Sequence, residues 1–185
     1  MTQYRQNLDQ QLRLAQQQNA LLQQQKRMAQ YRYQQQYYER LRQQQIRLQN
    51  ERNYNYNNDP YYYTPSSYRY NRDGTFYETN QYGADLLRRA VNNGYQEGYH
   101  AGQADRQDRW NSNYQDSYAY RDANYGYNGR YVQQDEYNYY FRQGFQRGYQ
   151  DGYSNDYRNG RRDNNGNYAM LSTVLGLILG LQLLD

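Results

Sequence analysis

The chain has 185 residues and a net charge of +4, and its length suits one domain of ordinary size. Leu, Ile, Val and Phe together number only 24, whereas Tyr alone numbers 29, so one conventional aliphatic core is excluded. The absence of Cys excludes disulfides, thiolate catalysis and zinc ribbons, and the single histidine, His100, excludes a multi-histidine metal site. Residues 1–11 are too polar for a signal peptide.

Residues 1–52 form a Gln/Arg-rich, basic arm for which the composition predicts a long helix. The arm has a net charge of +6, 18 Gln and no Gly or Pro. Its apolar residues follow a heptad for two or three turns only, and the pattern of the first set fails at Asn19 and Lys26. These sets are Leu8, Leu12, Ala15 and Leu22 in the first, and Leu14, Leu21 and Met28 in the second. We therefore expect a polar helix with a weak coiled-coil seam.

The arm admits several functions. Its charge suits a nucleic acid, an anionic membrane surface or an acidic partner, although a solvated helix explains the same charge. A Gln-rich tract of this kind can also be disordered and prone to aggregation. The sequence of the arm leaves these alternatives open.

Residues 53–80 are predicted to be a disordered, low-complexity linker. The segment contains both prolines, eight Tyr and six Asn, and Pro and Asn both interrupt helices. Residues 72–74, Arg-Asp-Gly, are expected to form one tight turn. The alternation of Tyr and polar residues suits a strand, but the sequence shows no partner strand for it.

An internal repeat with a spacing of 50 residues follows the linker. The first copy is RAVNNGYQEGYHAGQADR, residues 89–106, and the second is YYFRQGFQRGYQDGYSNDYR, residues 139–158. Glycines recur every four residues in both copies, which is a helical spacing. Glycines inside a helix cost about 1 kcal/mol each relative to Ala, and close approach of another backbone offsets this cost.

We therefore predict a glycine zipper, in which the two repeat helices pack groove against groove with aromatic rings at the flanks. A flexible Gly/Tyr tract and a ligand groove are the alternatives. The expected packing residues are Gly94, Gly98, Gly102, Gly144, Gly148 and Gly152, with Tyr95, Tyr99, Phe141, Phe145, Tyr149 and Tyr153. Between the copies, a helical stripe is expected to continue to about Ala123. A turn at residues 124–131 then precedes a second helix that starts near Gln134.

The stretches GYQEGYHAGQADR, YAYRDANYGYNG and FRQGFQRGYQDGY resemble an uncharacterised family of bacterial Tyr- and Gly-rich proteins with GYxxGY repeats. The resemblance covers about residues 82–158. Members of that family are often predicted to be exported, so the resemblance implies a place in the cell envelope. It implies no activity and no functional residue.

The chain closes with an apolar segment, residues 169–184, for which we expect a short helix of about 24 Å. Gly176 and Gly180 repeat the four-residue spacing and are expected to take part in helix packing. Three interpretations are open: a C-terminal membrane anchor, a buried helix against which the glycine-faced repeats pack, or an oligomerisation helix.

These features predict an all-α protein with four regions: a helical arm (1–52), a disordered linker (53–80), a helical repeat region (81–160) and an apolar helix (161–185). His100 and the carboxylate pairs Asp105/Asp108 and Asp135/Glu136 are assigned to solvated surfaces, and no cofactor or small-molecule substrate is expected. We expect a non-enzymatic structural or scaffolding protein that self-associates and belongs to the envelope, with a membrane contact through residues 169–184. The alternative is an Arg/Tyr-rich protein that binds nucleic acid, through residues 1–52, or forms condensates.

Overall fold

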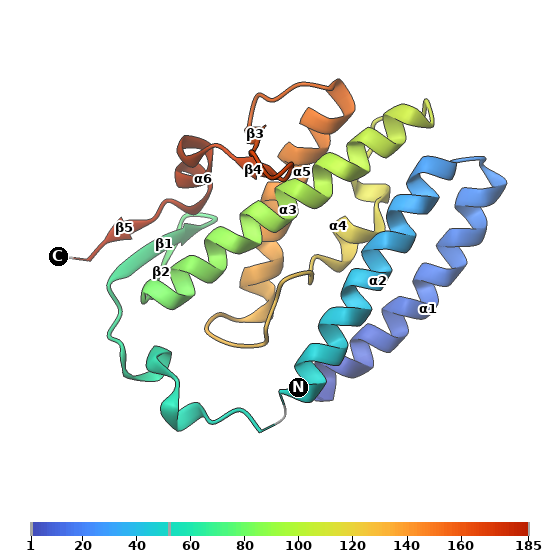
Figure 1. The fold of residues 1–185 in the computed structure, drawn as a ribbon. Coiled ribbons are helices and arrows are strands. Elements are labelled where there is room, and N and C mark those ends of the chain that lie inside the picture. Colours follow the sequence, from blue (N-terminus) through green and yellow to red (C-terminus); the bar gives the residue numbers. More distant parts are fainter. Residues whose placement is uncertain (1, 52, 185) are drawn as a thin grey trace.

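A computed structural model describes residues 2–51 and 53–184, and Figure 1 shows their arrangement. The α-helices are α1 (Thr2–Gln24), α2 (Met28–Asn50), α3 (Gln81–Gln107), α4 (Tyr118–Asp122), α5 (Gln134–Ser154) and α6 (Ser172–Leu179). The strands are β1 (Tyr68–Arg72), β2 (Thr75–Thr79), β3 (Gly160–Arg162), β4 (Tyr168–Met170) and β5 (Gln182–Leu183). Short 3-10 turns are η1 (Tyr56–Asn58), η2 (Pro60–Tyr63) and η3 (Tyr114–Asp116).

Helices α3 and α5 lie side by side at the centre of the molecule and run parallel. Gly94 of α3 lies against the backbone of Phe141, and Gly102, two turns later, lies against that of Tyr149. Because the numbers rise together on both helices, the helices point in the same direction. The 50-residue repeat therefore brings matching residues of its two copies next to each other, and helix α5 begins at Gln134, as its sequence predicts.

The parallel arrangement requires a connection that returns along the length of α3, which is about 40 Å for its 27 residues. Residues 108–133 make this return. They contain only η3 and the five-residue helix α4, so the expected continuous helix up to Ala123 is wrong. Ala123 has a φ of 55° and ends α4 in the left-handed conformation.

The basic arm is a helical hairpin rather than one long helix. Lys26, with a φ of 58°, lies in the turn between α1 and α2. The start of α2 is held by α3, because the Asp108 carboxylate accepts hydrogen bonds from the amides of Ala29 and Gln30 at 2.9 and 2.8 Å. Figure 1 shows α1 and α2 side by side, with α2 next to α3. The side chains of Leu8 and Leu12, and residues 1 and 52 of the arm, lie outside the described residues.

Residues 53–80 are ordered, so the expected disordered linker is wrong. Strands β1 and β2 pair antiparallel, with Tyr70 opposite Tyr77, and the expected tight turn joins them at Asp73 and Gly74. The partner strand that the sequence did not reveal is therefore the next segment of the same hairpin. Asn80 then caps α3 by accepting hydrogen bonds from the amides of Tyr82 and Gly83.

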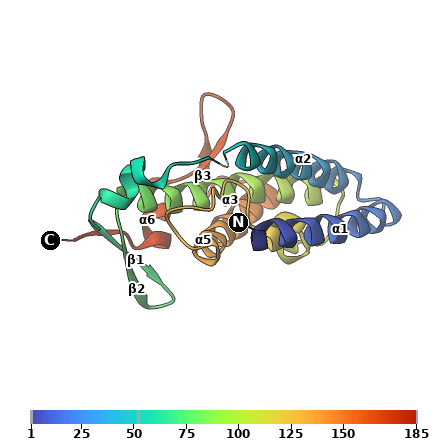
Figure 2. The ribbon, with the colours of Figure 1, turned by 90° about the horizontal axis from the view of Figure 1, so that it is seen from below.

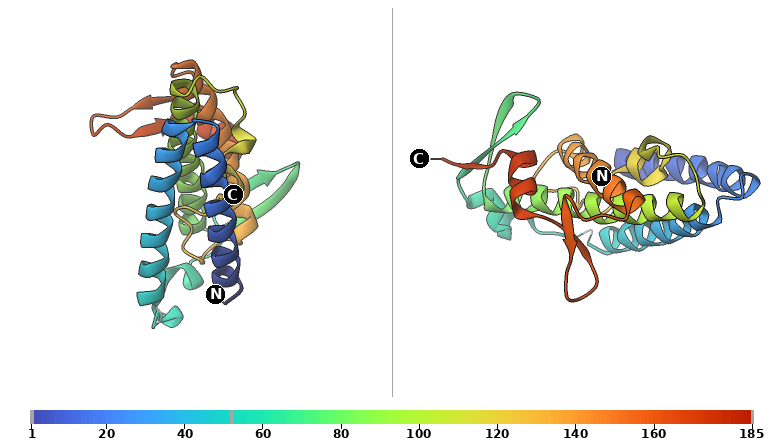
Figure 3. Two further views of the ribbon diagram at one scale, coloured as in Figure 1. Left: turned by 90° about the vertical axis from the view of Figure 1, so that its right-hand side faces the viewer. Right: turned by 90° about the horizontal axis from the view of Figure 1, so that it is seen from above.

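The C-terminal segment forms a shorter helix than its composition predicts. Helix α6 has eight residues, because Met170 belongs to β4 and Gly180 ends the helix with a φ of 53°. Strand β5 then pairs with β1, which gives a three-stranded sheet in the order β2-β1-β5, and β3 and β4 form a second sheet. The two hairpins project from opposite sides of the helical body (Figures 2 and 3).

The fold is thus mostly helical but carries two antiparallel sheets, so the expected all-α class is wrong. The strands are difficult to predict from the sequence because each is only two to five residues long and contains polar residues. Across the described residues, no helix is long and apolar enough to cross a membrane.

Candidate functional site

The glycines of the two repeats bring the backbones of α3 and α5 into direct contact. A Cβ atom placed on Gly98 would strike the Phe145 carbonyl and lie 2.8 Å from the Tyr149 amide nitrogen. Gly148 faces the Tyr95 carbonyl in the same way from the other helix. The other predicted packing glycines, Gly94, Gly102, Gly144 and Gly152, have equivalent backbone neighbours. Only glycine fits this seam without moving the helices apart.

Aromatic rings fill the space on both sides of the seam. Five of the six rings named from the sequence are completely buried: Tyr95, Tyr99, Phe141, Phe145 and Tyr149. The sixth, Tyr153, is half-buried, and its hydroxyl donates a hydrogen bond to the Trp110 carbonyl at 2.7 Å. Large aromatic side chains therefore lie on both sides of the glycine seam.

Gly176 and Gly180 do not take part in this packing, contrary to expectation. Nothing lies within 4 Å of a Cβ placed on Gly176, and Gly180 approaches only Asn71 while it ends α6. Helix α6 is also not the buried partner of the glycine seam, since Leu177 is 84% exposed and the two repeat helices face each other. The four-residue spacing in α6 is therefore not a packing signal.

Buried tyrosine hydroxyls donate hydrogen bonds to buried carboxylates throughout the core. Four such pairs, all between residues far apart in the chain, are Tyr95–Asp151 at 2.8 Å, Tyr149–Asp105 at 2.7 Å, Tyr37–Asp122 at 2.7 Å and Tyr33–Glu97 at 3.1 Å. The carboxylates are at most 3% exposed. Sequence analysis missed Glu97, Asp122 and Asp151, because nothing in the chain marks an acidic residue as buried.

Two arginines of α2 and of the turn before it complete this network. The Arg27 guanidinium lies 2.5 Å from the Asp105 carboxylate, and that of Arg40 lies 2.6 Å from Glu97. The assignment of Asp105 and Asp108 to a solvated face is wrong for this reason: Asp105 is 1% exposed, and Asp108 caps α2. The network ties the helical hairpin to the central pair.

Burial shifts the pKa values of three carboxyl groups of the network. Burial raises the pKa of the Glu97 carboxyl, while the charge of Arg40 opposes the shift. Burial likewise raises the pKa of Asp105 and Asp122, and hydrogen bonds from Tyr149 and Tyr37, respectively, oppose it. The carboxylates of the network thus interact with tyrosine hydroxyls and arginines of the same chain, and these contacts join the helices.

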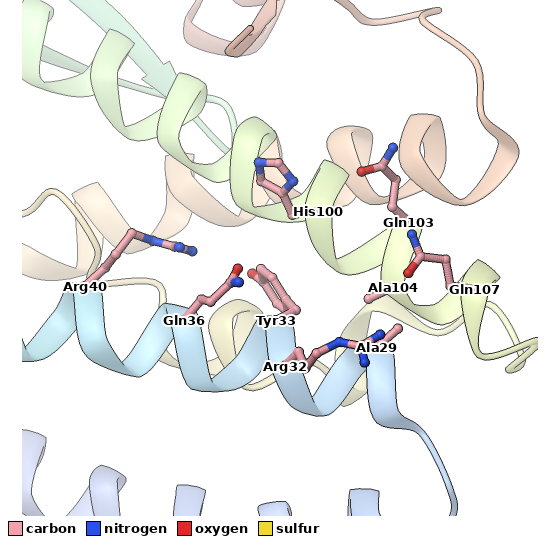
Figure 4. Close-up of a pocket in the computed structure, with 9 residues that line it drawn as sticks. All are labelled: Ala29, Arg32, Tyr33, Gln36, Arg40, His100, Gln103, Ala104 and Gln107. Carbon is pink, nitrogen blue, oxygen red and sulfur yellow. The ribbon is translucent and has the colours of Figure 1, made fainter.

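A groove of about 250 Å³ lies over this network between α2 and α3 (Figure 4). Arg40 and Gln36 of α2 face His100 of α3 across it, and Arg32, Gln103 and Gln107 add further polar side chains. His100 is half-buried here rather than on an open surface, and burial, with a smaller effect of the Arg40 charge, lowers its pKa. The neutral imidazole, the Arg32 guanidinium and the amides offer hydrogen-bond donors to a polar or anionic group.

The comparisons with known proteins leave the site to be interpreted on its own. No protein-family model matches the chain, and neither the curated proteins nor the solved structures contain a significant match. Within the described residues, no group of three or more His, Asp or Glu side chains is placed to hold a metal ion.

Proposed function

We propose that the protein is a non-enzymatic structural or scaffolding protein that self-associates through the outer face of α1. The observation that carries this proposal is the exposure of Leu14 and Leu21, at 58% and 50%, on an otherwise polar helix. Ala15 and Leu22, one residue further along, are buried in the hairpin. Among the described residues, helix α1 thus has one apolar stripe that is buried and one that is largely exposed.

The exposed stripe borders a groove that suits a second copy of the same stripe. Leu14 and Leu21 form one wall of a space of about 440 Å³, and Tyr118 and Arg121 at α4 form part of the other. In a two-fold symmetric contact, the leucines of each copy enter the groove of the other.

The charge distribution favours an identical partner over an oppositely charged one. Residues 14–25 contain no Asp, Glu, Lys or Arg, although the arm as a whole is strongly basic. Two copies can therefore bring this part of α1 together without like-charge repulsion, and Arg121 on the facing wall is paired with Asp116 at 3.7 Å. A partner chosen by charge would contact the arginines elsewhere on the arm instead.

Sedimentation velocity of the full chain tests self-association. The mass obtained for the wild type is expected to exceed the monomer mass of 22.6 kDa. The double variant Leu14→Gln, Leu21→Gln is expected to be a monomer with unchanged helicity. Leu177→Gln is the control, since it removes an even more exposed leucine, which lies in α6. A double variant that keeps the wild-type mass, or a monomeric wild type, would refute the proposal.

Envelope association is the second part of the proposal, and it rests on α6 and β5. Leu177 and Leu183 are 84% and 70% exposed, and the apolar end they form suits a contact with the interfacial region of a membrane. The protein should co-sediment with vesicles of phosphatidylethanolamine and phosphatidylglycerol. Leu177→Gln should weaken this binding and the Leu14/Leu21 variant should not; equal binding by all three proteins would refute this part.

The nucleic-acid alternative has less support from the contacts. Arg27 and Arg40 of the basic arm are already paired with Asp105 and Glu97, so their charges are not free for phosphates. Salt-sensitive binding of single-stranded RNA by the full chain would nevertheless favour that alternative.

A further inference from the structure

A cleft lined with tyrosines lies where η2, the β1–β2 hairpin and the loop before α5 meet, at the end of the molecule where Figure 1 shows β1 and β2. Its volume of about 460 Å³ is that of a site for a small organic group. We propose that this cleft binds a guanidinium or ammonium group, from either a free organic cation or a basic side chain. No residue of α1 lines the cleft, so the proposal is independent of self-association.

Two stacked pairs of tyrosines line the cleft, one from η2 and the loop before α5 and the other from the β1–β2 hairpin. Tyr61 of η2 stacks on Tyr131, with ring centroids 4.6 Å apart and planes inclined by 29°. On the hairpin, Tyr70 stacks on Tyr77 with centroids 5.5 Å apart and planes inclined by 22°. The negative face of an aromatic ring attracts a cation, most strongly where water is partly excluded.

The charged side chains around the cleft have a negative excess. One guanidinium, that of Arg72, serves two carboxylates, Asp135 at 3.0 Å and Glu136 at 2.6 Å. Glu78 adds another carboxylate to the lining. A bound cation would balance this excess, whereas an anion would increase it.

The other arginine of the lining does not offset this excess. Arg130 is paired with Glu51 at 2.6 Å, and its guanidinium lies over the ring of Tyr54. Its charge is therefore already paired with that of Glu51.

Glu136 supplies a specific acceptor. The residue is 7% exposed, and its Oε2 atom makes no hydrogen bond of good geometry to the described residues, although the carboxylate contributes to the raised pKa of the nearby Tyr70. Glu136 lines the cleft, and Oε2 is the carboxylate oxygen that Arg72 does not hold. Thr79 also lines the cleft, but its hydroxyl oxygen lies against Gly83 of α3. A carboxylate oxygen accepts hydrogen bonds, so Glu136 selects a cation with N–H donors over a quaternary ammonium ion.

Isothermal titration of the full chain with n-butylguanidinium and n-butylurea tests the charge requirement. The two probes have the same shape and differ in charge, so butylguanidinium is expected to bind and butylurea to bind at least about 10-fold more weakly. Tetramethylammonium, which has no N–H donor, should also bind more weakly than butylguanidinium. A blocked Gly-Arg-Gly peptide distinguishes the sources: tighter binding than butylguanidinium points to a protein side chain, and equal binding points to a free cation. Equal affinities for butylguanidinium and butylurea would refute the proposal.

Neighbouring residues provide matched variants. Glu136→Gln should weaken butylguanidinium binding about 10-fold or more, whereas Asp135→Asn should change it less than twofold. Both substitutions remove one carboxylate from the first turn of α5 and from Arg72, but only Glu136 lines the cleft. Tyr77→Leu should weaken binding about 3- to 10-fold, and Phe76→Leu, the preceding residue of β2, should have no effect. Equal effects within either pair would overturn the assignment, and the Tyr77 pair gives the answer independently if Glu136→Gln does not fold.

Discussion

Replacing Gly98 with Ala tests whether backbone contact between α3 and α5 holds the fold together. In an isolated helix, Gly→Ala stabilises by about 1 kcal/mol. Here the new methyl group would strike the Phe145 carbonyl and the Tyr149 amide, both backbone atoms of α5. The sign of the effect therefore depends on whether the helices touch.

The expected magnitude follows from the atoms that the methyl group meets. Overpacking a core costs about 1–3 kcal/mol, and the upper value applies because backbone atoms cannot rotate away as a side chain does. When the gain in helix propensity is subtracted, the free energy of unfolding falls by about 2 kcal/mol. For a protein of this size, that loss lowers Tm by about 4–8 °C.

Gly176→Ala is the matched control, because it makes the same substitution in helix α6, where nothing lies within 4 Å. It should stabilise by up to about 1 kcal/mol and raise Tm by about 2–4 °C. Thermal unfolding followed by circular dichroism measures both variants. If Gly98→Ala raised Tm as Gly176→Ala does, the close contact between the helix backbones would be refuted.

Other variants test the polar network and the groove. Arg27→Met should cost about 3–5 kcal/mol in urea unfolding because it leaves Asp105 buried and unpaired, whereas Arg158→Met, in an exposed pair, should leave the midpoint unchanged. Tyr37→Phe should cost about 1–3 kcal/mol through the lost hydrogen bond to Asp122, and a cost near zero would place that hydroxyl in water. His100 gives one imidazole signal in NMR spectra, and its titration midpoint should lie below the ordinary value of 6.5. The folded state then binds the proton at lower pH than the unfolded state, so this contribution to stability is present above about pH 6.5 and is lost as the pH falls through the folded pKa. His100→Gln should remove that loss, and a midpoint at or above 6.5 would contradict the burial.

Local signals in the sequence were sufficient for the repeat helices and for one turn. The four-residue glycine spacing predicts α3 and α5, and Arg-Asp-Gly predicts the turn between β1 and β2. The failure of the heptad at Asn19 and Lys26 was also informative, although it suggested only a weak seam. In the structure Asn19 accepts a hydrogen bond from Gln34 across the hairpin, and Lys26 lies in its turn. At Lys26 the break in periodicity was the signal of a break in the helix, whereas Asn19 lies within α1 and marks a contact with α2.

Interactions between distant segments had no local signal. Strand β5 has two residues and pairs with β1 more than a hundred positions earlier, so its apolar sequence could only be assigned to a helix. The ion pair between Arg27 and Asp105 spans 78 positions, and each residue alone resembles an ordinary surface charge. The cleft lined by Tyr61, Tyr77 and Glu136 joins three segments, two of which were expected to be a disordered linker.

The tyrosine content explains why this core needs buried charges at all. Each buried tyrosine adds a hydroxyl that must find an acceptor, because an unpaired hydroxyl in the interior is costly. Tyr140 uses the carbonyl of Asn71, whereas Tyr95 uses the carboxylate of Asp151 and Tyr149 that of Asp105. Burial of the Asp105 carboxyl raises its pKa and so makes its anion less favourable. Arginine suits the resulting need for a partner better than lysine, since its planar group is less strongly hydrated and donates several hydrogen bonds. The buried acids and the two arginines that pair with them, Arg27 and Arg40, are therefore consequences of building the core from tyrosine, and they can be explained without assigning the carboxylates to catalysis.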